Sequence, residues 1–181
     1  MTLPVWLLCA TALWLGATTA HAALPIGATA PTFTTEAALA GQALEFDMAK
    51  ALEQGPVVLY FFPKAFTQGC TVEAHAFAEA TPKFRALGAT VVGMSNDDIA
   101  TLQRFSTEAC RDQFAVAADP QAQTIRAYDA AAAANPQRAH RISYVIASDG
   151  KVRFVHQGSD PEAHVQQTLA AVQRLKANRG Q

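Results

Sequence analysis

The chain has 181 residues, of which 50% are hydrophobic and 16% are charged, and its formal net charge is -1. This length and composition predict one globular domain with a sizeable core and exclude a disordered chain. A net charge near zero, without a cluster of lysines and arginines, argues against nucleic acid or an anionic membrane surface as a partner.

The first 22 residues differ in composition from the rest of the chain. Residues 3–18 are largely apolar, and Ala20-His21-Ala22 has the small-x-small pattern that signal peptidase recognises. We therefore expect residues 1–22 to be a signal peptide and residues 23–181 to form a single exported, periplasmic domain without stable membrane association. The alternative is an uncleaved anchor, although the apolar run is shorter than the ~20 residues that span a bilayer and no Lys or Arg precedes it.

The first part of the mature chain contains two predicted strands. Leu24 to Thr35 is expected to be an extended segment, because prolines and a glycine punctuate it. A short strand near residues 43–47 and a helical turn at residues 48–53 should follow. Residues 57–62 are apolar without alternation, which is typical of a central strand buried on both faces.

A predicted helix begins at Cys70. Its apolar residues recur at steps of three and four and so share one face: Val72, Ala76, Phe77, Ala80, Phe84 and Leu87. Pro82 lies inside this pattern, which predicts a kink or break about one turn before it, and Gly88 is expected to end the helix. Residues 90–95 form a second predicted buried strand, so this strand–helix–strand unit predicts a parallel pair.

The rest of the chain continues the alternation of helices and strands. We expect a helix opened by Asp97-Asp98 with Cys110 in its last turn, followed by a short strand at 114–118. A helix from Asp119-Pro120 to about Tyr128 should come next, and then a loop with one helical turn at 129–139. The chain should end with a hairpin of strands 141–148 and 151–157 that turns at Asp149-Gly150, and an amphipathic helix from Ser159 onward. The whole pattern predicts an α/β fold with a central mixed sheet and helices on both faces.

Cys70 lies where the strand at residues 57–62 passes through a short turn into a helix. Backbone N–H groups in the first turn of a helix have no partner within the helix and carry the positive end of its dipole, so they favour a thiolate over a thiol. This position predicts a nucleophilic cysteine that is ionised and exposed at the mouth of the turn. The competing interpretation is an inert cysteine of the core.

The residues around Cys70 resemble the active-site signature of a known family. Pro63-x-x-x-Thr67-x-x-Cys70 is similar to the signature of the peroxiredoxins, and Gly69-Cys70-Thr71-x-Glu73 is similar to its form in the Q-type, or bacterioferritin-comigratory, subfamily. Further matching segments are Ile26-Gly27-x-x-Ala30-Pro31-x-Phe33, Val91-Val92-Gly93-Met94-Ser95, Arg141-Ile142-Ser143-Tyr144-Val145-Ile146 and Asp149-Gly150-Lys151. The resemblance covers roughly residues 25–176 and implies a thioredoxin-like fold of the peroxiredoxin type, in a subfamily whose members are often monomers.

The resemblance also implies a thiol peroxidase that reduces hydrogen peroxide and organic hydroperoxides without a cofactor or a metal. Cys70 would be the sulfur that attacks the O–O bond and becomes a sulfenic acid. Thr67 would offer its hydroxyl to sulfur and peroxide, Arg141 would favour the thiolate and bind the peroxide, and Pro63 would shield the sulfur from water. Glu73 matches a family position too, although an acidic residue in the first helical turn needs no further role.

A sulfenic acid must be resolved by a second thiol, and the mature chain offers one candidate. Cleavage of the leader removes Cys9 and leaves Cys70 and Cys110 in a compartment where disulfides persist. Relatives often carry the second thiol five residues after the first, where this chain has His75. The resemblance therefore implies an intramolecular Cys70–Cys110 disulfide that needs local unwinding, with a thioredoxin-like protein or a small thiol as reductant.

Two other functions remain open from the sequence. One is a thiol–disulfide oxidoreductase of the thioredoxin type, which is disfavoured because Cys70 has no partner in a Cys-x-x-Cys spacing. The other is a non-catalytic exported binding module with a structural Cys70–Cys110 disulfide. The histidines of the mature domain have no metal-ligand spacing, so we expect them to be surface or internally satisfied residues: His75, His140, His156 and His164.

Overall fold

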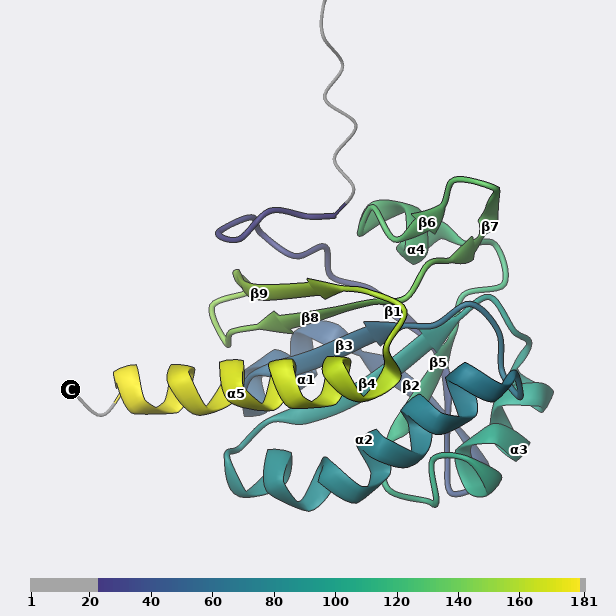
Figure 1. The fold of residues 1–181 in the computed structure, drawn as a ribbon, viewed down its shortest axis with the longest axis horizontal. Coiled ribbons are helices and arrows are strands. Elements are labelled where there is room, and N and C mark those ends of the chain that lie inside the picture. Colours follow the sequence, from purple (N-terminus) through teal and green to yellow (C-terminus); the bar gives the residue numbers. More distant parts are fainter. Residues whose placement is uncertain (1–22, 180–181) are drawn as a thin grey trace, which may run out of the picture.

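The computed structural model describes residues 23–179 (Figure 1), so the predicted signal peptide lies outside the described residues. In chain order the helices and strands are β1 (Thr34–Leu39), β2 (Gln42–Asp47), α1 (Met48–Gln54), β3 (Val57–Phe61), α2 (Gln68–Ala86), β4 (Thr90–Ser95), α3 (Ile99–Glu108), β5 (Ala115–Ala118), α4 (Gln123–Ala127), β6 (Ala131–Ala132), β7 (Asn135–Ala139), β8 (Ile142–Ile146), β9 (Val152–Gln157) and α5 (Pro161–Arg179). This alternation confirms the predicted α/β class. Within this part of the chain, no helix is both long and apolar enough to cross a bilayer.

The central sheet has seven strands in the order β2-β1-β5-β4-β3-β8-β9. Strands β3, β4 and β5 run parallel to one another, whereas the remaining pairs of neighbours in this sheet are antiparallel. The predicted parallel unit around α2 and the predicted β8–β9 hairpin are both present. The sheet is therefore mixed, as the pattern of elements predicts.

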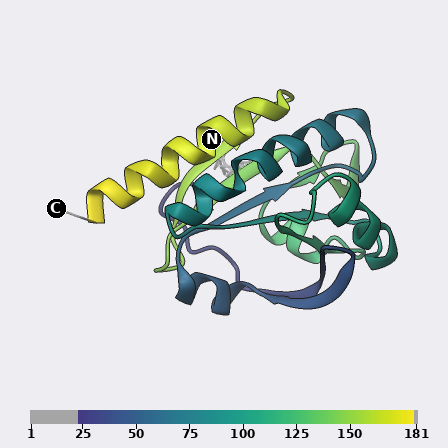
Figure 2. The same ribbon diagram turned by 90° about the horizontal axis from the view of Figure 1, so that it is seen from below.

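Strand β3 separates two hydrophobic cores, because successive side chains of a strand point to opposite faces of the sheet. Val58 and Tyr60 lie in the core covered by α2, α3 and α5. Leu59 and Phe61 lie in the core covered by α1 and α4. Figures 1 and 2 show α2 and α5 side by side on the first face. Burial on both faces places β3 inside the sheet, between β4 and β8, and so fixes where the next turn begins.

Helix α2 runs without interruption from Gln68 to Ala86, although Pro82 lies inside it. Of the predicted kink or break before Pro82, the break is wrong. A proline inside a helix costs roughly 3 kcal/mol, whereas full burial of one phenylalanine side chain contributes roughly 1.5–3 kcal/mol. Phe77 and Phe84 on this helix are both fully buried, so packing against the sheet offsets the cost of the proline.

Two pairs of strands form where the side chains have little preference for β structure. The sequence pattern does not predict β1, whose alanines and glutamate are poor strand formers, yet β1 lies between β2 and β5 and pairs with both. The predicted loop at residues 129–139 is wrong as well, because β6 pairs with β7 in a small antiparallel ladder. In both places backbone pairing with a neighbour decides the structure.

Two predicted helix boundaries also differ from those observed. Helix α4 begins at Gln123 and not at Asp119, because the Asp119 carboxylate accepts hydrogen bonds from the backbone N–H groups of Gln123 and Ile125, at 2.9 and 2.8 Å. Helix α3 ends at Glu108 with Ala109 as its C-cap. Cys110 therefore lies just beyond the helix, not in its last turn.

Candidate active site

Cys70 lies in the first turn of α2, close to the carboxyl end of β3. Strand β3 ends at Phe61, the chain turns through Pro63 and Phe66, and α2 begins after its N-cap residue Thr67. The N-terminus of a helix favours negative charge, so this location supports a thiolate. The cysteine is only 2% exposed, so the prediction of an exposed sulfur is wrong. The sulfur is thus placed at the start of α2 but shielded from solvent.

Asp97 holds this turn from the end of β4. Its Oδ2 accepts a hydrogen bond from the backbone N–H of Ala65 at 2.7 Å and another from Ser95 Oγ at 2.9 Å. Its Oδ1 lies 3.5 Å from Lys64 Nζ. The sequence pattern assigns Asp97 to the start of α3, but Asp98 is the N-cap there, and the buried carboxylate of Asp97 instead fixes the turn before α2.

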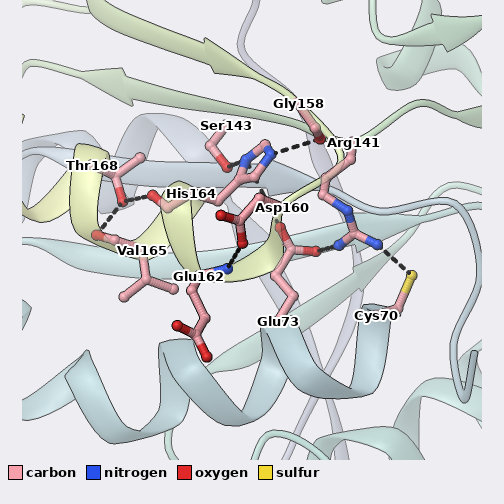
Figure 3. A network of polar contacts seen from close by, with 10 residues as sticks. All are labelled: Cys70, Glu73, Arg141, Ser143, Gly158, Asp160, Glu162, His164, Val165 and Thr168. Carbon is pink, nitrogen blue, oxygen red and sulfur yellow. Dashed lines mark hydrogen bonds and ion pairs between the residues drawn. The ribbon is translucent and has the colours of Figure 1, made fainter. Parts of the chain in front are cut away.

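Arg141 brings a positive charge to Cys70 from a distant part of the chain (Figure 3). It directly precedes β8, whose first residue, Ile142, pairs with Phe61 at the end of β3. The Nη2 of Arg141 donates a hydrogen bond to Cys70 Sγ over 3.6 Å, and its Nη1 donates to Oε2 of Glu73. The structure thus brings together two residues that the resemblance assigns to one site, and Glu73 orients the guanidinium between them.

The Thr67 hydroxyl is engaged within the turn itself. Its Oγ1 donates to the backbone carbonyl of Lys64 at 3.0 Å, a different partner from the sulfur expected from the sequence. A hydroxyl oxygen that donates its proton keeps its lone pairs as acceptors. Thr67 therefore offers an acceptor, and not a donor, to a molecule that approaches the turn.

A cavity of about 590 Å³ has Arg141 among its lining residues. Pro63, which is half-buried, forms part of its wall. The end of β7 and the residue after it also line the cavity: Arg138, Ala139 and His140. Cavities of roughly 300–1,000 Å³ are typical of small-molecule sites. The arrangement provides space for an organic substituent beside Pro63 and Arg141, while Cys70 is not among the residues that line the cavity.

A buried polar network continues from Arg141 through Glu73 towards α5 (Figure 3). Glu73 is fully buried; its Oε1 has no hydrogen-bond partner and lies 3.8 Å from Nδ1 of His164. The fully buried His164 has Ser143 Oγ 2.8 Å from its Nδ1 and the Gly158 carbonyl oxygen 3.1 Å from its Nε2. Burial raises the pKa of Glu73 to about 8, which Arg141 opposes, and burial lowers the pKa of His164 to about 4.

Sequence reasoning does not find Ser143 or His164 as part of the site. His164 is an internally satisfied histidine, one of the two alternatives expected for it, but its proximity to Glu73 comes from packing of α5 on α2. A weak signal exists in the spacing, since His164 and Thr168 stand four residues apart on one face of α5 and both are fully buried. Among residues 23–179, no group of three or more His, Cys, Asp or Glu side chains is arranged to hold a metal ion.

Comparison with known proteins decides the family. The family described as "AhpC/TSA family" matches residues 26–155 of this chain. The chain belongs to that family. Chloroplastic peroxiredoxin Q from Oryza sativa subsp. japonica is 31% identical over 150 residues, which cover 82% of this chain and 67% of the rice protein. Chloroplastic peroxiredoxin Q from Populus jackii is 33% identical over 121 residues, 66% of this chain and 56% of that protein.

Solved structures agree with this assignment. The crystal structure of peroxidoxin BcpB from Mycobacterium tuberculosis matches with a TM-score of 0.74 at 27% identity, over 82% of this chain and 96% of that chain. AhpC from Mycobacterium tuberculosis matches with a TM-score of 0.75 at 19% identity, over 86% of this chain and 95% of that chain, and supports the fold alone. The protein is a Q-type peroxiredoxin with a thioredoxin-like fold, and its family indicates a thiol-dependent peroxidase.

The other cysteine in the described part of this peroxiredoxin, Cys110, lies inside the same core as Cys70. Both are free thiols, and Cys110 is fully buried. Burial raises the pKa of the Cys110 thiol far above its usual range. The two residues that follow it, Arg111 and Asp112, have φ angles of 50° and 59°, a left-handed conformation that costs a residue with a side chain roughly 1–2 kcal/mol. Cys110 is thus held by a strained turn.

Proposed function

We propose that this peroxiredoxin reduces hydrogen peroxide and organic hydroperoxides through the Cys70 thiolate. The observation that carries the proposal is the hydrogen bond from Arg141 Nη2 to Cys70 Sγ, with Nη1 of the same guanidinium held by Glu73. A guanidinium stays charged at any relevant pH and donates in a fixed geometry. The guanidinium stabilises the thiolate before the reaction. The same guanidinium then donates a hydrogen bond to a peroxide oxygen bound next to the sulfur.

The reaction proceeds by in-line attack on the O–O bond. The Cys70 thiolate forms a bond to the hydroxyl oxygen of the hydroperoxide, the O–O bond breaks, and the alkoxide or hydroxide leaves and takes a proton from solvent. Cys70 is then a sulfenic acid. A lone pair of Thr67 Oγ1 accepts a hydrogen bond from the hydroperoxide O–H, because the Thr67 hydroxyl donates its own hydrogen bond to the backbone carbonyl of Lys64. Pro63 limits the access of water to the sulfur.

The cavity beside Arg141 accommodates the organic part of a hydroperoxide. Cys70 itself is almost inaccessible to solvent, so the substrate reaches the sulfur along the wall formed by Pro63 and Arg141. Phe66, which is 40% exposed in the turn before α2, packs against Phe105 of α3 and adds an exposed apolar ring near Cys70 in the chain. This arrangement favours organic hydroperoxides as well as hydrogen peroxide.

Cys110 resolves the sulfenic acid in our proposal. Its thiol attacks the sulfur of the Cys70 sulfenic acid, a disulfide forms and water leaves. A buried thiol must first be released, and the left-handed residues Arg111 and Asp112 lower the cost of opening the turn that holds it. A dithiol protein of the thioredoxin kind or a small thiol then reduces the disulfide, giving up two electrons and two protons.

Residues 1–22 direct the protein to the periplasm in this proposal, with cleavage before Ala23. The apolar run and the Ala20-His21-Ala22 pattern support it. Intact mass measurement of the protein from a periplasmic fraction checks the cleavage point, and a membrane-bound protein that retains residues 1–22 would contradict it.

We further propose that the protein acts as a monomer, which light scattering at micromolar concentration tests.

The peroxidase proposal is tested by stopped-flow measurement of peroxide consumption. We expect rapid oxidation of the wild type by hydrogen peroxide and by a bulky organic hydroperoxide, and none for Cys70→Ser. Cys110→Ser should still react once, because the attacking sulfur is intact. Slow reaction of the wild type, no faster than a free thiol, would overturn the proposed function.

Resolution by Cys110 is tested by mass spectrometry of the peroxide-treated mature protein. The expected product is a Cys70–Cys110 disulfide in the wild type, and a trapped Cys70 sulfenic acid in Cys110→Ser. Detection of sulfenic acid or a mixed disulfide, without the intramolecular link, would exclude Cys110 and leave an external thiol as the resolving group. Turnover with a thioredoxin-like protein and with a small thiol then identifies the class of reductant.

A further inference from the structure

Glu73, which holds the guanidinium of Arg141, lies on its other side close to His164, a residue that the proposed reaction does not use (Figure 3). Both side chains are fully buried, so the protons that they carry are fixed by their immediate neighbours. The Nε2 of His164 faces the carbonyl oxygen of Gly158 at 3.1 Å, and a carbonyl oxygen only accepts hydrogen bonds. The Nε2 therefore carries a proton, and Nδ1 of a neutral His164 has a lone pair.

The hydroxyl of Ser143, 2.8 Å from Nδ1, is placed to donate to that lone pair, and the free oxygen of Glu73 lies 3.8 Å from the same Nδ1. With an ionised Glu73, Oε1 and Nδ1 are two acceptors at 3.8 Å without a hydrogen between them, and Oε1 has no other partner. Leaving a buried polar atom unsatisfied costs roughly 1–3 kcal/mol or more. A proton on Oε1 removes this conflict, because the carboxylic O–H points at Nδ1 while Oε2 stays a carbonyl oxygen that accepts from Arg141. Oε1 and Nδ1 need to approach each other by roughly 1 Å or less to reach hydrogen-bond distance.

We propose that Glu73 of the reduced protein is a neutral carboxylic acid whose proton is directed at His164, so that Arg141 presents an uncompensated positive charge to Cys70. His164 is in this view a positioning residue: it acts on Cys70 only through Glu73 and Arg141. The effect on catalysis rests on the proposed peroxidase function, whereas the protonation state of Glu73 does not.

The groups around the pair agree with this assignment. The pKa of Glu73, raised by burial to about 8, favours the acid form at neutral pH, and that of His164, lowered by burial to about 4, favours the neutral ring. Arg141 is the cation that opposes protonation of Glu73. Around His164, the ring of His156 lies with its centroid 4.5 Å away and, like Arg141, disfavours a positive charge, while Asp160 favours it. Only Asp160 acts against a neutral His164 among these charged or titratable side chains.

A consequence for pH follows from the charge balance. When the pH rises past about 8, Glu73 releases its proton to solvent and its carboxylate compensates the charge of Arg141. The positive field at Cys70 falls, although Arg141 remains protonated. We expect the rate of reaction with peroxide to decline by roughly tenfold on this alkaline limb.

Infrared difference spectroscopy during a pH titration tests the protonation state directly and needs no peroxide. The expected signal is the carbonyl stretch of a protonated carboxyl group that disappears between about pH 7 and pH 9. It should be absent from Glu73→Gln and retained in Glu79→Gln, which removes an exposed carboxylate from the same helix. No such band in the wild type at neutral pH would overturn the proposal, whatever the peroxidase assay gives.

Two further variants distinguish positioning from a structural role. His164→Phe keeps a buried ring but removes the acceptor, so the midpoint of the Glu73 titration should fall by roughly one pH unit. Ser143→Ala removes the hydroxyl that competes for Nδ1, so the midpoint should rise. The alkaline limb of the peroxide rate should move with the infrared midpoint in each folded variant and vanish in Glu73→Gln. Equal midpoints in all folded variants would contradict a role for His164.

Discussion

Arg141 Nη2 lies 3.6 Å from Cys70 Sγ, although 71 positions separate the two residues in the chain. The contact exists because β8 pairs with β3 in an antiparallel register that sets Ile142 opposite Phe61. Arg141 stands one residue before this pair, at the edge of the sheet where β3 turns towards α2. Sheet register therefore controls the charge next to the sulfur.

Arg141→Lys should slow the reaction of Cys70 with peroxide by roughly 100-fold. A lysine keeps the charge but cannot contact Cys70 and Glu73 with two nitrogens of one planar group. Stopped-flow rates of the variant check this expectation. Arg153→Lys, which changes an exposed arginine paired with Asp149, is the matched control and should react like the wild type. Equal rates in Arg141→Lys and the control would argue against a role for guanidinium geometry.

Gly69→Ala should raise stability and lower activity in the same protein. Alanine is better than glycine inside a helix by roughly 1 kcal/mol, but a Cβ at position 69 would lie 3.0 Å from Nη2 of Arg141. The guanidinium, which Glu73 holds on its other side, must shift away from Cys70 to relieve this contact. Thermal unfolding checks the expected rise in stability, and the rate of reaction with peroxide checks the expected fall in activity. A variant with full activity would mean that Arg141 adjusts without loss.

Asp97→Ala should loosen the turn before α2 and impair peroxide reduction. The change leaves the buried N–H of Ala65 and the hydroxyl of Ser95 without the carboxylate that both contact, which costs roughly 1–3 kcal/mol. Asp98→Ala is the control, since loss of this N-cap destabilises α3 by roughly 1 kcal/mol but leaves the turn intact. We expect both variants to lose stability and only Asp97→Ala to lose activity beyond a few-fold.

Acid should destabilise the protein partly through His164. Its pKa is about 4 in the folded protein and 6.5 in the reference state, so the unfolded chain binds more protons between these values. The stability contributed by the neutral ring is present above about pH 6.5 and is lost as the pH falls towards 4, on the order of 2–3 kcal/mol. Glu73 acts in the opposite direction, because its raised pKa makes stability fall as the pH rises from 4.5 to about 8.

Thermal unfolding of the wild type and His164→Phe between about pH 4 and pH 7 isolates the contribution of His164. The wild type should lose more stability on acidification than the variant, because only the wild type has the imidazole that gains a proton on unfolding. His75→Phe, which replaces a half-buried histidine on α2, controls for the loss of an imidazole. The same acid-induced loss in wild type and His164→Phe would refute this assignment.

Arg111→Gly should stabilise the turn after Cys110 and slow formation of the disulfide. Glycine adopts a φ of 50° without the cost that a side chain brings, a gain of roughly 1 kcal/mol that exceeds the value of the exposed Arg111–Glu79 ion pair. If Cys110 is released by opening of this turn, the rate of Cys70–Cys110 bond formation should fall severalfold while the first reaction with peroxide is unchanged. Gln113→Gly, outside the left-handed residues, is the control; a faster disulfide in Arg111→Gly would contradict the mechanism.

The sequence by itself determined the class of fold, the position of Cys70 at the start of a helix and the family, because these depend on local patterns. The apolar run of β3, which does not alternate, and the periodic apolar face of α2 can each be recognised within one short stretch of sequence. Patterns of this kind failed where pairing or packing outweighed propensity, as in β1, in β6 and β7, and in the uninterrupted helix through Pro82.

The tertiary structure alone decided the environment of the sulfur. Burial of Cys70, the carboxylate of Asp97 under the turn, and the position of His164 behind Glu73 all join residues far apart in the sequence. Distances between such residues are set by sheet register and by the packing of α5 on α2, and the side chains of the network carry no local signal of their partners. Protonation of a buried group follows from the atoms that face it, which only the folded chain brings together.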